Sequence, residues 1–263
     1  MANDAWDSGR AYEQYVGRWS RMVAGQFLDW LQPATQLAWT DIGCGTGALT
    51  SAILAACHPR SVRGVDASED FVAQARQRVV DRRVHFEVGD ASHLPWEAAT
   101  FDVAVSGLVL NFVPDPVVMV REMTRVTRRE GSVAVYVWDY AEGMQMLRHF
   151  WDAAAAVQPD AARLDEATRF PVCRAEPLRG VFESAALTSI QVRAIEVPTF
   201  FDNFDDFWRP FLGKTGPAPA YLASLDDATR ERIRQQLESR LATQHAGRIE
   251  LTARAWAAQG VVA

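Results

Sequence analysis

The sequence predicts an α/β protein built on a doubly wound, mostly parallel sheet, and three observations support this prediction. Strand-like runs alternate with helical patterns five times between about residues 36 and 138. A glycine-rich turn, Gly43 to Gly47, joins the first strand to the first helix. Asp41, Asp66 and Asp90 stand at the ends of the first three strands. Repeated strand–helix units give a parallel sheet with helices on both faces.

Length and charge restrict the classes of protein to which the chain can belong. Its 263 residues suffice for one large domain with a buried core. The net charge of −6 gives no support for a nucleic-acid partner, which normally requires a basic face. The first ten residues are polar and acidic and do not resemble a signal peptide, and no apolar run approaches the ~18 residues of a membrane helix. We therefore expect no membrane partner.

Cysteine and histidine usage points to an intracellular protein without a metal. The three cysteines, Cys44, Cys57 and Cys173, are scattered and indicate a reducing compartment, so we expect a cytoplasmic location. The five histidines show no metal-ligand spacing with one another or with the cysteines, so no metal site is predicted. The oligomeric state stays open.

Hydrophobic periodicity and residues typical of helix ends predict the helices and strands before residue 140. The first ~30 residues form an amphipathic helix, or two helices broken near Gly17 or Gly25. Helices are predicted from about residues 48 to 57, after a cap at Ser68, and after Pro114-Asp115-Pro116; Arg128, Arg129 and Gly131 are expected to end the last of these. The predicted strands are Gln36–Ile42, Ser61–Asp66, Arg83–Asp90, Phe101–Leu110 and Gly131–Trp138.

After Trp138 the regular alternation of strands and helices ends. Helices are predicted over Met144–Val157 and Pro177–Ala186, and strands over Leu187–Val197 and Arg248–Gln259. The insertion between these strands, about residues 200–246, is too long for a plain hairpin loop and is interpreted as a helical cap over the site. We expect one domain, residues 1–263. Its parts are an N-terminal helical segment (1–35), a cofactor-binding core (36–138), a helical substrate region (139–186) and the last two strands with the cap (187–263).

The segment "DIGCGTGA" fits two cofactor motifs. Gly43, Gly45 and Ala48 match the G-x-G-x-x-A pattern of dinucleotide sites, whereas Asp41 with Gly43, Gly45 and Gly47 matches D-x-G-x-G-x-G. Asp66, 19 residues after Gly47, suits a ribose diol in either case. A carboxylate before the glycines is unfavourable near a pyrophosphate and favourable near an ammonium or a sulfonium. Asp41 therefore favours a cationic cofactor, and Asp90 offers an acceptor for an adenine amino group.

Four segments together carry a resemblance to a known family. "DIGCGTGALT", "GVDASEDFVAQAR", "GDASHLP" and "FDVAVSGLVLNFVPDP" occur in the order and at the spacings of class I S-adenosylmethionine (SAM)-dependent methyltransferases. The chain most resembles the small-molecule branch related to ubiquinone- and menaquinone-biosynthesis methyltransferases, over about Trp39 to Trp138. The resemblance implies a Rossmann-like, seven-stranded sheet with an antiparallel last strand, and SAM as the cofactor.

The resemblance also assigns cofactor residues. Asp41 and the loop of Gly43, Cys44, Gly45 and Gly47 would lie at the methionine end, with Cys44 interpreted as a small side chain in the turn. Asp66 and Ala67 would serve the ribose, Asp90 and Ala91 the adenine, and Gly107 and Leu108 the side of the cofactor. Arg18, in "YEQYVGRWS", either pairs with the methionine carboxylate or belongs to a helix that packs on the sheet.

The acceptor side carries no catalytic motif. Relatives often have a histidine after the fourth strand, where this chain has Asn111, and amides do not act as general bases. His149, Asp139 and Tyr15 are the candidates for a base; helix-surface or capping roles are the alternatives for the first two. Arg125, Arg128 and Arg129, like Arg230, Arg232 and Arg234, are interpreted as solvated helix faces.

Aromatic residues of the insertion bear on the acceptor. Phe200, Phe204, Phe207, Trp208 and Phe211 form either a buried helix face or the lining of an apolar cavity. The sequence thus predicts an enzyme that transfers a methyl group from SAM to a small, apolar or aromatic molecule, with O, N or C as the acceptor atom. The alternatives are a non-catalytic SAM-binding protein and a nicotinamide-dependent oxidoreductase.

Overall fold

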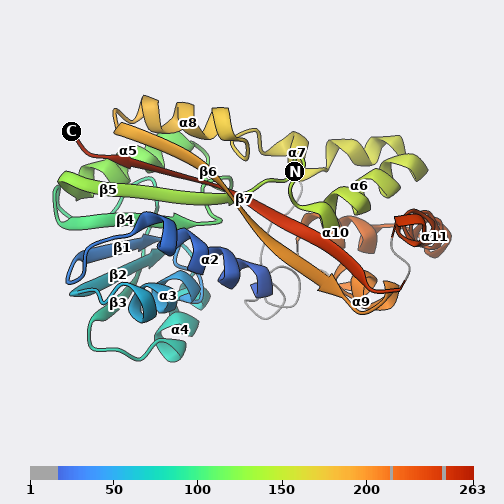
Figure 1. Ribbon diagram of the computed structural model, residues 1–263, viewed down its shortest axis with the longest axis horizontal. Helices are drawn as coiled ribbons and strands as arrows, with labels where there is room; N and C mark the ends of the chain where they lie inside the picture. Colours follow the sequence, from blue (N-terminus) through green and yellow to red (C-terminus); the bar gives the residue numbers. More distant parts are fainter. Residues whose placement is uncertain (1–16, 214–215, 245–246) are drawn as a thin grey trace. The chain divides into compact units, whose positions relative to one another are not determined.

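A computed structural model describes residues 17–213, 216–244 and 247–263, except for the side chains of residues 18, 243 and 244. Seven strands form one sheet in the order β3-β2-β1-β4-β5-β7-β6. The strands are β1 (Ala38–Ile42), β2 (Ser61–Asp66), β3 (Val84–Val88), β4 (Phe101–Gly107), β5 (Thr127–Trp138), β6 (Thr188–Phe201) and β7 (Ile249–Val261). The predicted doubly wound sheet of seven strands is confirmed (Figure 1).

The first five strands are parallel, as the strand–helix alternation predicts. Asp41 pairs with Gly64 of β2 on one side and with Val105 of β4 on the other, so the carboxyl ends of these strands lie together. β7 runs the opposite way: Glu130 N donates to Val262 O, whereas Asp139 N donates to Arg254 O. This reversal confirms the antiparallel end of the sheet.

Helices follow the strands closely. They are α2 (Arg18–Leu31), α3 (Ala48–Ala56), α4 (Glu69–Arg78), α5 (Pro116–Val126), α6 (Gln145–Val157), α7 (Glu166–Arg169), α8 (Ala175–Ser184), α9 (Phe204–Trp208), α10 (Pro217–Ser224) and α11 (Asp227–Gln244), with 3-10 turns η2 (Pro159–Arg163) and η3 (Arg209–Leu212). Ser68 caps α4 by accepting from Phe71 N, as predicted. Asp115 caps α5 by accepting from Val117 N and Val118 N, and Pro116 starts the helix.

α2 continues through Gly25, which excludes the alternative of two helices broken at this residue. Two other local predictions are corrected. α5 ends at Val126, and Arg128 and Arg129 begin β5 instead of ending the helix. The predicted aromatic stripe is not a single helix, because Phe200 belongs to β6 and Phe211 to η3. Pairing of Thr127 with β4 and the hydrogen bond of Glu130 N to Val262 O extend β5 beyond the hydrophobic run that predicted it.

Contacts divide the chain into two compact units. The sheet unit comprises Arg21–Val137, Val172–Ile195 and Ala255–Ala263. The helical unit comprises Trp138–Pro171, Glu196–Arg254 and the described end of Met1–Ser20. β6 and β7 pass from one unit into the other. No helix in the described part of the chain is both long and apolar enough to cross a membrane.

Aromatic side chains form the core of the helical unit. Phe207 and Phe211 are fully buried, and the ring of Phe211 stacks on Phe150 with centroids 4.5 Å apart. Trp19 is buried against Phe201 of β6 at 5.8 Å, edge to face. These contacts favour the interpretation of the insertion's aromatics as a buried face. Phe200 differs, since it is 41% exposed beneath the guanidinium of Arg248.

Candidate functional site

The predicted cofactor residues of the sheet unit meet at one edge of the sheet. Asp41 lies in β1, Asp66 ends β2, and Asp90 follows β3 by two residues. Leu108 follows β4 directly. Because β3, β2, β1 and β4 are neighbours in that order and are parallel, their carboxyl ends form a continuous row. Ligands of doubly wound sheets bind outside this edge.

The glycine loop has the backbone that the motif requires. Gly43, Gly45 and Gly47 have φ angles of 72°, 51° and 85°, in the left-handed region that favours glycine. A Cβ at Gly43 would lie 2.5 Å from the Val109 side chain, so a larger residue cannot replace it. A Cβ at Gly45 would meet nothing within 4 Å. The loop therefore has open space beside Gly45, where a ligand can approach the backbone.

Asp41 is a buried carboxylate whose two oxygens differ. Oδ2 accepts a hydrogen bond of 2.7 Å from Thr50 Oγ1 in α3, whereas Oδ1 is buried and finds no partner in the described residues. Burial raises the pKa of Asp41 to about 7, with a smaller contribution from the charge of Asp66, against the effect of the Thr50 bond. An unpartnered buried acceptor is costly, and a nearby cation would lower that cost.

Asp66 links the loop to the start of α4. Its Oδ2 accepts from Gly45 N and its Oδ1 from Ser68 N, both at 2.9 Å. Burial raises the pKa of this carboxyl group, while the two backbone bonds act in the opposite direction. Each carboxylate oxygen has a second lone pair, so Asp66 retains the capacity to accept from a diol. It also fixes Gly45, a structural role that the sequence did not reveal.

Cys44 points away from this edge, into the core. Its side chain is 5% exposed and packs with Val72, Ala75 and Phe86. Burial raises the pKa of its thiol, which keeps the sulfur protonated and unreactive. This placement agrees with the interpretation of Cys44 as a small side chain in the turn, and it leaves only the backbone of Cys44 to the loop.

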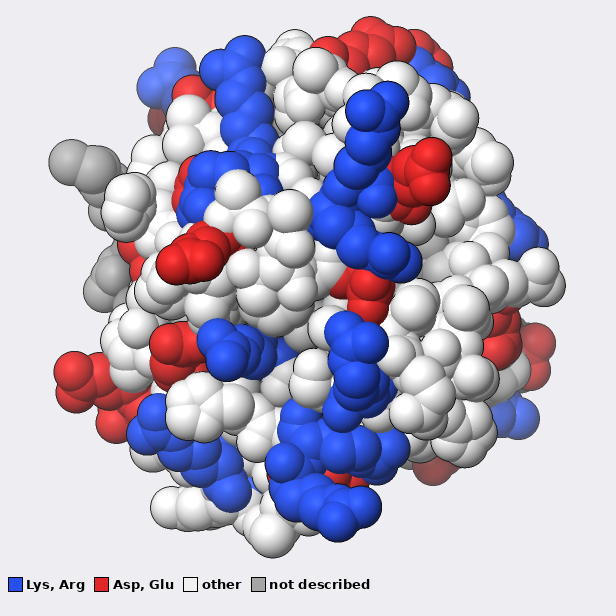
Figure 2. All heavy atoms as spheres, turned by 90° about the vertical axis from the view of Figure 1, so that its left-hand side faces the viewer, with Lys and Arg blue, Asp and Glu red and all other residues white. Residues whose placement is uncertain are grey.

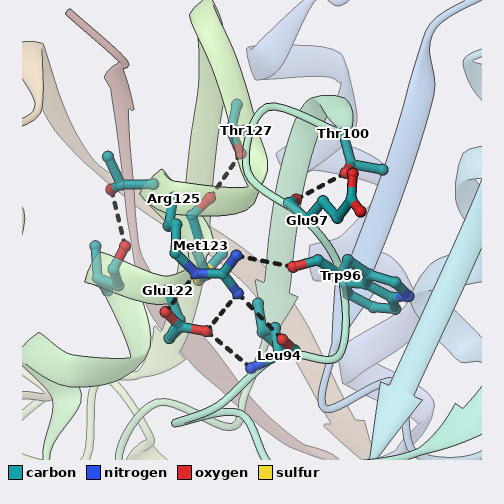
Figure 3. A network of polar contacts seen from close by, with 10 residues as sticks. Leu94, Trp96, Glu97, Thr100, Glu122, Met123, Arg125 and Thr127 are labelled. Carbon is teal, nitrogen blue, oxygen red and sulfur yellow. Dashed lines mark hydrogen bonds and ion pairs between the residues drawn. The ribbon is translucent and has the colours of Figure 1, made fainter.

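The loop that carries Asp90 is held by α5, as Figure 3 shows. Arg125 donates from Nη1 to Trp96 O at 2.8 Å and from Nη2 to Leu94 O at 3.1 Å. Glu122 accepts from Leu94 N at 2.9 Å and forms an ion pair of 2.7 Å with Arg125. The Arg125 guanidinium lowers the pKa of Glu122, so the pair stays charged. Arg125 is thus no solvated helix residue, contrary to the prediction.

The Arg125 contacts allow a direct test. We expect Arg125→Ala to lower the free energy of unfolding by about 1–3 kcal/mol, since the Leu94 and Trp96 carbonyls lose their Arg125 donors and, among the described residues, the Glu122 carboxylate keeps only Leu94 N. Urea unfolding at neutral pH measures the loss. Arg129→Ala, at an exposed position of β5, is the control and should change stability by less than about 0.5 kcal/mol. Equal losses in both variants would contradict the proposed role of Arg125.

The candidate bases occupy other environments. Asp139 is buried, and its carboxylate accepts from Ala141 N and Glu142 N at 3.1 Å and from Arg254 Nε at 2.7 Å. These contacts favour the capping alternative for Asp139. His149 is partly exposed on α6, in the same helical unit. Tyr15 lies outside the described residues, and so does the side chain of Arg18.

Sequence reasoning missed two buried groups. Glu166 of α7 is 2% exposed and accepts a hydrogen bond from Trp151 Nε1, and burial raises its pKa to about 7. Asn111 is 8% exposed, and its Nδ2 has no hydrogen-bond partner in the described part of the chain. The sequence contained no signal for the Glu166 environment, because residues 15 positions apart on different helices form it. For Asn111, the sequence offered one signal, which is its position after β4.

Comparisons with known proteins agree with this geometry. Residues 40–135 match the family model described as "Methyltransferase domain". The chain is 29% identical over 192 residues to the 2-methyl-6-phytyl-1,4-hydroquinone methyltransferase of Synechocystis, covering 72% of this chain and 58% of that protein. It is 28% identical over 166 residues to the demethylmenaquinone methyltransferase of Staphylococcus aureus. This match covers 59% of this chain and 69% of that protein.

A solved structure shares the fold. The phosphoethanolamine N-methyltransferase 2 of Haemonchus contortus, in complex with S-adenosyl-L-methionine, superposes with a TM-score of 0.56 at 17% identity. The match covers 90% of this chain and 52% of that one. At such low identity the likeness concerns the fold, and the row of acids and glycines at the sheet edge supplies the chemical argument.

Proposed function

Residues 40–135 of this chain carry a class I methyltransferase domain whose cofactor is SAM, and we propose that the protein transfers the methyl group to a small apolar or aromatic molecule. The observation that carries the proposal is the edge formed by Asp41, the glycine loop, Asp66 and Asp90. Its buried Asp41 suits a cationic cofactor and would be unfavourable beside a pyrophosphate.

Each residue of this edge has a proposed place along the cofactor. We assign the methionine end to Asp41 and the loop beside the open space at Gly45. Asp66 would accept from the ribose hydroxyls, with Ala67 next to it, and Asp90 and Ala91 would face the adenine. Asp90 is exposed and uses Oδ1 to accept from Ser92 N at 2.8 Å, so Oδ2 is available to an amino group. Gly107 and Leu108 would lie along the side of the cofactor.

Methyl transfer asks little of the protein beyond alignment. The cofactor supplies an activated methyl group, which is displaced in line by the acceptor. The chain's residues hold both partners at the right distance and exclude water, effects that together can contribute most of the rate enhancement. This explains how the domain can function although Asp139 is engaged in capping bonds.

The apolar character of the acceptor rests on two kinds of support. The curated relatives are named as methyltransferases of a hydroquinone and of demethylmenaquinone. Among the described residues of the helical unit, Phe200 (41%) and Leu212 (61%) are exposed, whereas Phe150, Trp151, Phe207 and Phe211 are buried. We therefore propose a hydroquinone-type ring as the first acceptor to test.

Labelled SAM provides the test of this function. The protein is incubated with methyl-labelled SAM and either a prenylated hydroquinone, reduced demethylmenaquinone or phosphoethanolamine. We expect label in the hydroquinone products and none in phosphoethanolamine. Transfer to phosphoethanolamine instead would contradict the apolar acceptor. Stabilisation by S-adenosylhomocysteine without transfer to any acceptor would favour a non-catalytic SAM-binding protein, and stabilisation by NADH alone would refute the SAM site.

Asn111 is the proposed donor to the acceptor molecule. Its buried Nδ2 has no partner among the described residues, and an oxygen of a hydroquinone ring could accept from it. We expect Asn111→Asp, which has the same shape but no N–H, to lower kcat/KM about tenfold or more, the value of one lost hydrogen bond to a charged or polarised oxygen. The affinity for S-adenosylhomocysteine should stay unchanged. A parallel loss of that affinity would assign Nδ2 to the cofactor instead.

A further inference from the structure

The opposite edge of the sheet, where the parallel strands begin, carries a hollow rich in arginine. Its lining includes Gln36 before β1, Arg60 and Ser61 at the start of β2, and Asp81, Arg82 and Arg83 before β3. The hollow measures about 830 Å³, within the ~300–1,000 Å³ typical of small-molecule sites. Figure 2 looks onto this end of the sheet and shows arginine side chains gathered on it.

Two of the arginines are held in place by aspartates. Arg83 donates from Nε and Nη2 to both oxygens of Asp81, at 3.0 and 2.7 Å. Arg60 donates from Nη2 to Asp102 at 3.5 Å, and Asp102 also pairs with Arg128. Arg83 keeps its Nη1 hydrogens for another acceptor, and Arg60 keeps most of its donors. The arginine pairing lowers the pKa of Asp81 to about 2, so this anchor stays charged.

Arg82 has no such anchor. It is exposed, and its charge contributes to the lowered pKa of the neighbouring Asp81. Arg60, Arg82 and Arg83 thus surround one hollow whose lining contains a single carboxylate. Like charges so placed repel one another, and a bound anion would offset that repulsion. The arrangement is notable in a chain whose net charge is −6.

We infer that this hollow binds the phosphate group of a small phosphorylated ligand. Planar guanidinium groups offer paired N–H donors that match phosphate oxygens, and two of the three are pre-oriented by their aspartates. The hollow exceeds the size of a lone phosphate, so the phosphate belongs to a larger molecule. It lies at the opposite edge of the sheet unit from Asp41 and Asp66, so the phosphorylated ligand and SAM do not compete.

Inorganic pyrophosphate is the probe for this site. At low and matched ionic strength, pyrophosphate should raise the melting temperature of the wild-type protein, and isothermal titration should detect binding. Arg82→Gln should weaken the affinity about tenfold, the effect of one charge-assisted contact. Since the Arg82 side chain is exposed, this variant should keep the fold. Arg193→Gln, an exposed position of β6, is the control and should bind like the wild type.

The binding measurements distinguish a phosphate site from its absence. Unchanged binding of S-adenosylhomocysteine in Arg82→Gln, together with weakened pyrophosphate binding, supports the site. No binding to the wild type, or equal weakening in Arg82→Gln and Arg193→Gln, would overturn it. Sedimentation with phosphatidylglycerol vesicles then identifies the source of the phosphate. Arg82-dependent sedimentation indicates a lipid headgroup, and protein that stays in solution while binding pyrophosphate indicates a free phosphate ester.

Discussion

Asp66→Ala is expected to abolish the stabilisation of this protein by S-adenosylhomocysteine. In the wild type, the ligand at 100 times its Kd should raise the free energy of unfolding by about 2.7 kcal/mol, a shift of about 5–10 °C in Tm. The variant loses the proposed acceptor for the ribose hydroxyls. It also loses the bond of 2.9 Å that fixes Gly45 N, so the glycine loop is no longer pre-oriented.

A thermal-shift titration measures this effect, and a second aspartate provides the control. Asp29 is exposed on α2, and Asp29→Ala should keep the full ligand-induced shift. The unliganded Asp66→Ala protein should lose about 1–3 kcal/mol of stability, because Gly45 N and Ser68 N lose their acceptor, so each ligand-induced shift is measured against the unliganded Tm of the same variant. A full shift in Asp66→Ala would place the ribose elsewhere and would contradict the assigned edge.

The second large effect concerns pH and Glu166. This carboxyl group has a pKa of about 7 in the folded protein, against 4.5 for its ordinary value, because burial disfavours the charged form. Between these values the folded state keeps a proton that the unfolded state has lost, so stability decreases as pH rises. Between pH 4.5 and pH 8, the ionisation of Glu166 should lower the free energy of unfolding by about 3 kcal/mol.

Urea unfolding from pH 4.5 to 8 checks this prediction. Glu166→Gln keeps an oxygen for Trp151 Nε1 but cannot ionise, so its stability should fall less with pH than that of the wild type. Asp41, whose pKa is also about 7, should leave a residual slope in this variant. Glu142→Gln, at a side chain that is 81% exposed, is the control and should follow the wild type. The idea is wrong if Glu166→Gln and the wild type show the same slope.

The fold was predictable where local signals and tertiary packing agree. β2 has the bounds predicted for it, Ser61–Asp66, and α4 starts after its Ser68 cap. The prediction of helix and strand bounds failed where it used only residue types at neighbouring positions. Arg128 and Arg129 were taken as the end of a helix, but they lie in β5 between Thr127, which pairs with Phe101 of β4, and Glu130, whose N–H donates to Val262 O after β7. Pairing partners lie far along the chain, so periodicity within a window cannot reveal them.

The sequence by itself determined the sheet, the glycine turn and the row of acids at the strand ends, because each depends on residue type and spacing along a few neighbouring positions. Only the tertiary structure decided how those acids are used. It buried Asp41 and tied Asp66 to Gly45, and within the described parts of the chain it gave neither Asp41 Oδ1 nor Asn111 Nδ2 a hydrogen-bond partner. Burial and hydrogen bonding arise from elements distant in sequence, and they set the pKa values and free donors on which the chemistry depends.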